Sequence, residues 1–159
     1  MSVNTGKVAG RREVVYESLD DLLMDAENLV AGKNVKMLGN WSLGQMLAHL
    51  AAALHMSIDG TDHRPPWFIR LLGPFLKRRV LRKMSAGFQL PKPVAEKLIP
   101  ATPVAPEEGL RLLQEAVKRF RSDTSRQPHN VFGKLTGAEW HQLHLRHSEL
   151  HMSFATRDS

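Results

Sequence analysis

The chain has 159 residues and no cysteine, so it is the size of one ordinary domain, and disulfides, thiolate metal sites and cysteine nucleophiles are all excluded. Its formal net charge is +6, but residues 64–95 hold eight Lys or Arg and no Asp or Glu, while the rest of the chain has 14 basic and 16 acidic residues. The positive charge is therefore local, and it could meet phosphate, a membrane surface, an anionic substrate or only solvent.

We expect residues 1–11 to be a flexible start and residues 12–156 to form one domain. The pair Arg11-Arg12 precedes the acidic stretch EVVYESLDDLL, which does not have the composition of an apolar targeting segment. The longest uncharged stretch, 37–58, holds histidine, glutamine and asparagine, so it is poorly suited to spanning a membrane. The lack of cysteine fits a reducing compartment, and we expect a cytoplasmic protein without a membrane span.

Two helices are predicted in the first 60 residues. The first covers residues 18–31, where leucine, alanine and valine recur at helical spacing between Ser18, a candidate N-cap, and Gly32. The second begins with a capping box, SLGQ at 42–45, and runs to about residue 58. Because its apolar surface is wide and it carries no charge, the second helix should lie deep in the fold.

Residues 61–105 form a long connection that is rich in proline. Within it, residues 67–83 could be helical, with a break or kink at Gly73-Pro74 because proline removes a backbone donor. Residues 89–103 look extended and irregular. A connection of this length usually has a task, such as covering a pocket or forming a partner surface.

Two further helices are predicted after this crossover. One starts at Pro106 and runs to about Arg121, and the other opens with the capping box TGAE at 136–139. The only candidate strand is a short extension at 14–16. Four principal helices with a long crossover between the second and the third predict an all-α protein, a four-helix bundle whose sites are built from side chains that face one another.

The last helix carries four histidines within WHQLHLRHSELHMSF, residues 140–154. At about 100° per residue, His147 falls in the middle of the apolar sector and His151 lies near its edge. His144 lies just beyond that edge, and His141 points further toward solvent. His147 and His151 are four residues apart, so their side chains lie one above the other and can converge on one metal ion. The apolar residues of the sector are Trp140, Leu143, Leu150 and Phe154.

A third inward histidine would strengthen the metal interpretation. A single buried histidine is more often a core residue that is hydrogen-bonded to a neighbour, whereas two stacked imidazoles are hard to satisfy without a cation or polar partners. His49 lies within the uncharged second helix and should be partly buried. Together with His147 and His151 it would give a three-His site with open positions, as in catalytic zinc sites. His55 and His63 are expected at the surface or in local hydrogen bonds.

Three segments of the chain resemble the DinB/YfiT-like superfamily, in particular a branch of domains of unknown function. They are NWSLGQMLAHLAAALHMSIDG, HNVFGKLTGAEW and RHSELH. The resemblance implies a four-helix bundle with a divalent metal held by His49, His147 and His151, the same three residues that helical geometry selects. Characterised members of the superfamily include S-transferases and isomerases that use low-molecular-weight thiols, and homodimers are common among them.

The first functional hypothesis is a metal-dependent enzyme that is thiol S-transferase-like or hydrolase-like and acts on a small molecule, with a low-molecular-weight thiol as one substrate. The metal would generate the nucleophile from water or from the thiol. Imidazole ligands suit zinc or nickel, with iron, copper or manganese as alternatives. The inward face offers no carboxylate base, because Glu149 projects away from His147 and Glu139 is better used as a cap. Gln45 could orient His49, but it is also half of a capping box.

The alternative hypothesis is a non-catalytic binding protein whose basic crossover recognises an anionic ligand or partner. Trp67 and Phe68 could stack on such a ligand. No nucleic-acid motif is present, so nucleic acid is not expected, and a solvated basic helix is the simpler interpretation. The two hypotheses join if Arg78, Arg79 and Arg82 steer an anionic substrate toward the metal. The other basic residues of the segment 67–83 are Arg70, Lys77 and Lys83.

Overall fold

The computed structural model describes residues 3–62, 65–87 and 102–157. The described residues are mostly helical and add one small two-stranded sheet. A short 3-10 helix, η1 (Thr5–Lys7), comes first. The α-helices are α1 (Leu19–Ala31), α2 (Leu43–Asp59), α3 (Trp67–Arg82), α5 (Pro106–Ser122) and α6 (Gly137–Met152), and the strands are β1 (Val35–Met37) and β2 (Ala155–Arg157).

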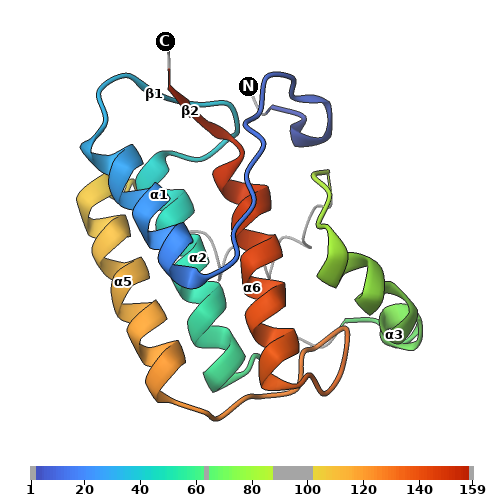
Figure 1. The fold of residues 1–159 in the computed structure, drawn as a ribbon. Coiled ribbons are helices and arrows are strands. Elements are labelled where there is room, and N and C mark those ends of the chain that lie inside the picture. Colours follow the sequence, from blue (N-terminus) through green and yellow to red (C-terminus); the bar gives the residue numbers. More distant parts are fainter. Residues whose placement is uncertain (1–2, 63–64, 88–101, 158–159) are drawn as a thin grey trace.

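Four of the helices, α1, α2, α5 and α6, lie side by side, and α3 lies outside them next to α6 (Figure 1). The predicted N-caps are confirmed, since Ser18, Ser42 and Thr136 each accept a hydrogen bond from the third residue of their helix in a complete capping box. The sequence therefore determines where α1, α2 and α6 begin.

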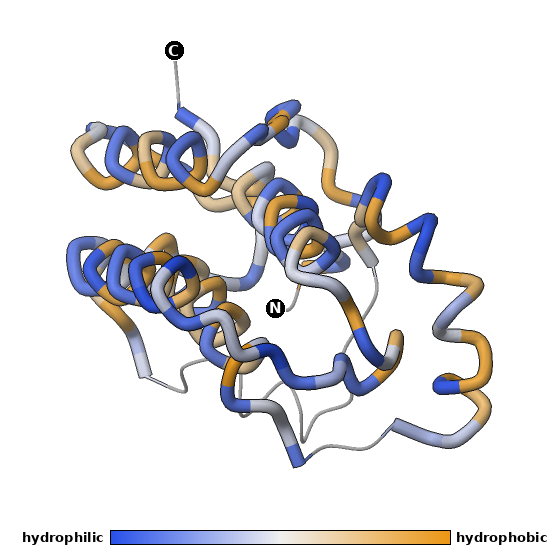
Figure 2. The backbone as a smooth tube through the Cα atoms, turned by 60° about the horizontal axis from the view of Figure 1, so that its bottom comes forward, coloured by the Kyte–Doolittle hydropathy of each residue, from blue (hydrophilic) through white to orange (hydrophobic). Residues whose placement is uncertain are grey.

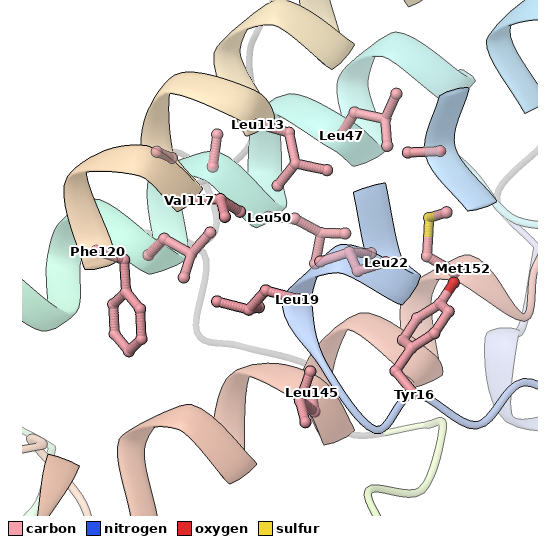
Figure 3. Packing of buried hydrophobic residues seen from close by; sticks show 14 of the residues in the cluster. Tyr16, Leu19, Leu22, Leu47, Leu50, Leu113, Val117, Phe120, Leu145 and Met152 are labelled. Atoms are coloured by element: carbon pink, nitrogen blue, oxygen red, sulfur yellow. The ribbon is translucent and has the colours of Figure 1, made fainter. Parts of the chain in front are cut away.

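The core lies between α1, α2, α5 and α6 (Figure 3). Leu22, Leu47 and Leu113 are fully buried in it. Each such side chain contributes about 1.5–3 kcal/mol relative to an exposed one. The backbones of α2 and α5 touch, because a Cβ built on Gly109 would lie 2.5 Å from the carbonyl oxygen of Gly44. Any larger residue at Gly109 would push these two helices apart.

The predicted crossover helix is confirmed as α3, and of the break or kink predicted at Gly73-Pro74 the structure excludes the break. The helix runs through Pro74 without interruption. Gly73 is buried and lies so close to Val131 that a Cβ would overlap the carbonyl oxygen of that residue. This contact holds the middle of α3 against the rest of the protein and offsets the backbone hydrogen bond that proline cannot make. The predicted extended stretch 89–103 lies almost entirely outside the described residues.

The sheet was not predicted. β1 pairs with β2 in antiparallel register, Val35 opposite Arg157 and Met37 opposite Ala155, whereas the expected strand at 14–16 is not a strand. Three-residue strands are too short to show alternation in a sequence. Because β2 follows α6 almost directly, the last helix ends at Met152, whereas the predicted helix includes Phe154.

The N-terminal segment contacts the middle of α1 and the last turn of α6. The guanidinium of Arg12 donates to both carboxylate oxygens of Asp25, at 2.9 and 2.8 Å, and also to the carbonyl of Met152. The Tyr16 hydroxyl donates to the same carboxylate at 2.6 Å. These contacts fix the last turn of α6, while the division of the chain into residues 1–11 and 12–156 stays a prediction.

Within the described ranges, every helix is too short or too polar to cross a bilayer.

Candidate metal centre

Three histidine side chains converge where α2 faces α6. The Nε2 atom of His147 lies 3.3 Å from Nε2 of His49 and 3.0 Å from Nε2 of His151. One ring nitrogen from each residue lies within 4.8 Å of the other two. Nitrogen ligands around a tetrahedral zinc ion, each about 2.0–2.1 Å from the metal, are separated by about 3.3 Å. The predicted trio is therefore brought together, and two of its three separations match those of neighbouring ligands on a single ion.

Local sequence explains this convergence. The capping box at Ser42 starts α2 so that His49, in its second turn, is buried with only 2% of its surface exposed. On α6 the four-residue spacing stacks His147 and His151 on one side of the helix. His151 lies in the last turn, which the contacts of Arg12 and of the sheet hold in place.

Trp41 covers one side of the histidine group, and the sequence analysis missed it. Its ring is stacked on His151, with centroids 5.1 Å apart and planes 15° apart, and it lies 4.7 Å from the ring of His49. Trp41 directly precedes the N-cap Ser42. A large apolar residue at that position commonly packs back over the first turns of its helix, and this rule could have placed it near His49.

Burial keeps the imidazoles of His147 and His151 neutral. Desolvation, with a smaller contribution from the neighbouring imidazoles, lowers the pKa of His147 well below its ordinary value of 6.5 and that of His151 to about 3. A metal needs neutral imidazole, because the ligand nitrogen must offer a lone pair. His147 and His151 are therefore in the protonation state that a metal ligand needs at neutral pH.

Hydrogen bonds alone cannot account for both contacts of the His147 Nε2 atom. Nε2 of His147 faces nitrogens of both His49 and His151. A neutral imidazole nitrogen has either one proton or one lone pair in the ring plane, so only one of these two contacts can be a hydrogen bond. Three lone pairs directed at one cation would satisfy both contacts together, and the donor set therefore fits a divalent ion.

Nearby polar side chains are engaged elsewhere, as predicted. The carboxylate of Glu149 accepts from the backbone of Tyr16 and pairs with Arg146. Glu139 caps α6 and pairs with Lys77 at 2.7 Å. The side-chain oxygen of Gln45 accepts from the backbone of Ser42 at 3.0 Å, which confirms its capping role.

Other histidines fall outside the group. His144, placed at the edge of the apolar sector by the helical wheel, is buried, stacked on Trp140 and in edge contact with Phe120. The helical wheel did not predict the burial of His144, because α6 buries a second side in addition to the one that faces α2. His141 is half-buried, so it is less exposed than predicted. The Nδ1 atom of His55 lies 3.0 Å from Arg119, in line with the expected local hydrogen bond, and His63 lies outside the described residues.

Arg78, Arg79 and Arg82 are exposed on α3. Their role in steering an anion toward the histidines stays a prediction. A surface hollow lies at the far end of α2, between Gly60, Arg70, His129 and Phe132. None of the three converging histidines lines it. The metal centre is therefore not at the bottom of this hollow.

The comparisons with known proteins add a family but no function. A family model described as "Protein of unknown function (DUF1569)" matches residues 8–158. Neither a curated protein nor a solved structure matches the chain. The region matched by the family model includes all three converging histidines and both helices that carry them.

Proposed function

The chain belongs to the DUF1569 family of proteins of unknown function, and we propose that it is an enzyme that depends on a divalent metal held by His49, His147 and His151. The observation that supports this proposal most directly is the meeting of three imidazole rings, with Nε2 of His147 3.3 Å from that of His49 and 3.0 Å from that of His151. Zinc or nickel suits three imidazoles best, with iron or manganese as alternatives.

A divalent ion with three protein ligands keeps open positions, where it lowers the pKa of a water molecule or of a thiol that binds it. The chain itself supplies the spacing, the burial and the stacked wall of Trp41. Because Glu139 and Glu149 are engaged elsewhere, neither is available as a general base beside the site. We therefore favour thiol transfer to an electrophile, with metal-assisted hydrolysis as the close variant.

The finer classification is part of the same proposal. The HxxxH of residues 147–151 together with the WSxxQxLxHL segment at 41–50 supports membership of the DinB/YfiT-like superfamily. The side-by-side arrangement of α1, α2, α5 and α6 is compatible with the four-helix bundle of that superfamily (Figure 1). A homodimer and a cytoplasmic location remain predictions that follow from the resemblance and the composition.

A panel of low-molecular-weight thiols, each mixed with a chromogenic aryl halide, tests the enzyme proposal. We expect the metal-loaded protein to accelerate conjugation of at least one thiol roughly 10-fold or more over buffer, because lowering a thiol pKa of about 8.5 below 7 raises the thiolate fraction by about that factor. The hydrolysis variant is tested with an activated aryl ester. Chelator treatment and His49→Ala should abolish the rate, whereas His141→Ala should keep it.

Failure of every thiol and of the ester, with each metal, would contradict the enzyme proposal. The result would favour the second candidate, a binding protein that uses the exposed basic residues of α3. Activity that persists fully in His49→Ala would also contradict it, since a three-ligand site cannot lose a ligand without effect.

A further inference from the structure

The helix α3 presents an apolar face to solvent. Trp67 is 75% exposed, Leu71 64% and Phe75 81%. These residues recur every four positions, and a second row next to them has the same spacing, so together they cover one side of the first two and a half turns. Figure 2 shows hydrophobic segments along this helix, away from the rest of the fold. The α3 apolar face consists of Trp67, Phe68, Leu71, Leu72, Phe75 and Leu76.

The following turn of α3 is basic. Arg78, Arg79 and Arg82 are exposed, as is Lys83 directly after the helix, and we call these four residues the α3 basic turn. Within the described part of the chain, the only α3 side chain in an ion pair is Lys77, which pairs with Glu139. By helical geometry the basic turn continues the same side of α3 that the apolar face occupies.

The opposite side of α3 is fixed to the protein. Leu81 is buried, and its carbonyl accepts a hydrogen bond from Gln142 of α6 at 2.9 Å. Lys77 reaches Glu139 of the same helix at 2.7 Å. Since these contacts and the approach of Gly73 to Val131 anchor the inner side, the apolar face is the outer side of a docked helix.

We propose that α3 attaches the protein to an anionic lipid surface. Large apolar and aromatic side chains next to a cluster of Lys and Arg characterise helices that lie in the membrane interface. The α3 apolar face would enter the boundary between head groups and acyl chains, and the α3 basic turn would meet lipid phosphates and carboxylates. The positive charge of this segment is complementary to an anionic bilayer, because residues 64–95 contain no acidic side chain that the lipid would repel.

Other occupants fit this surface less well. Nucleic acid would neutralise the basic turn but would leave most of the six apolar side chains in water. A second copy of the chain would have to offer acidic groups to four exposed cations, whereas the chain outside residues 64–95 has only two more acidic than basic residues. A bilayer supplies both the apolar layer and the negative charge over one flat surface.

Flotation of the full chain with lipid vesicles tests the inference. The vesicles are made of phosphatidylcholine alone or with about one third phosphatidylserine. We expect binding to the anionic vesicles that weakens as salt increases, and roughly 10-fold or greater loss of affinity on neutral vesicles. In the variant Trp41→Phe/Trp140→Phe, the remaining Trp67 emission should move to shorter wavelength on binding.

Two sets of substitutions separate the apolar and charged contributions. Leu71→Ser/Phe75→Ser should reduce binding at least about 10-fold without altering folding, because both residues are exposed. Arg78→Gln/Arg79→Gln/Arg82→Gln should reduce it at least as much on anionic vesicles. The matched control removes the same charge from exposed lysines elsewhere: Lys36→Gln, Lys118→Gln and Lys134→Gln.

Three results would overturn the inference. The first is no binding to anionic vesicles at low salt, and the second is binding that the control triple reduces as much as the α3 triple. The third is a dimer, measured by light scattering, that Leu71→Ser/Phe75→Ser converts to monomer, since a second copy would then cover the α3 apolar face. The proposed enzyme function is measured without vesicles, so either proposal can fail without the other.

Discussion

Replacing His147 by alanine should lower the affinity of the protein for a divalent ion at least about 100-fold. His147 is the central residue of the group, because its Nε2 atom lies 3.3 Å from that of His49 and 3.0 Å from that of His151. Loss of an outer-shell partner of a metal ligand already costs about 10–100-fold in affinity, and loss of a direct ligand should cost more. The remaining pair would hold the ion with two imidazoles only.

A competition titration against a chromophoric chelator measures this difference on untagged protein. His141→Ala is the matched control, since it removes a half-buried imidazole from the same helix outside the group. Metal should also raise the stability of wild type by about 4 kcal/mol at 1,000 times the dissociation constant, and it should not do so for His147→Ala. Equal affinity of wild type and His147→Ala would refute the assignment of His147 as a ligand.

Lowering the pH from about 7 to about 5 should destabilise the metal-free protein, and about 2 kcal/mol of that loss should vanish in His144→Phe. Burial lowers the pKa of His144 to about 3 from its ordinary value of 6.5. As the pH falls through about 6.5, the His144 imidazole therefore binds a proton in the unfolded chain but stays neutral in the folded chain. The folded state loses stability as pH falls below 6.5, at about 1.4 kcal/mol per pH unit for this residue.

Urea unfolding of wild type and His144→Phe at both pH values measures this effect. Phenylalanine keeps a ring between Trp140 and Phe120 but cannot titrate. The comparison uses the pH difference within each protein, so a change in stability at neutral pH does not affect it. The same pH dependence in both proteins would show that His144 is not held neutral in the folded state.

Much of the helical fold could be predicted because its signals are local. Capping boxes at Ser42 and Thr136 mark where α2 and α6 begin, and apolar spacing identifies the core positions such as Leu47 and Leu113. The sheet of β1 and β2 could not be predicted, since its strands are three residues long and lie far apart in the sequence. The sequence left open whether α3 breaks at Gly73-Pro74, since the contact of Gly73 with Val131 is tertiary.

The three histidines could be predicted because i, i+4 spacing and an uncharged helix reduce the choice to few residues. Which surfaces meet α6 was not predictable from one helical wheel, so the burial of His144 was missed. Trp41 was missed because its ring reaches His151 from a residue before the helix, a contact that no periodicity shows. The exposure of Phe75 likewise depends on which side of α3 docks against α6.

The most direct test of the metal centre is X-ray absorption at the metal edge of untagged wild-type protein, reconstituted in turn with zinc, nickel, iron and manganese. We predict about one tightly bound ion per chain for zinc or nickel, with the outer-shell scattering of three imidazoles at metal–nitrogen distances of about 2.0–2.1 Å for zinc. Absence of a bound ion after every reconstitution, or a first shell with fewer than two imidazoles, would contradict the assignment of His49, His147 and His151 as a metal site.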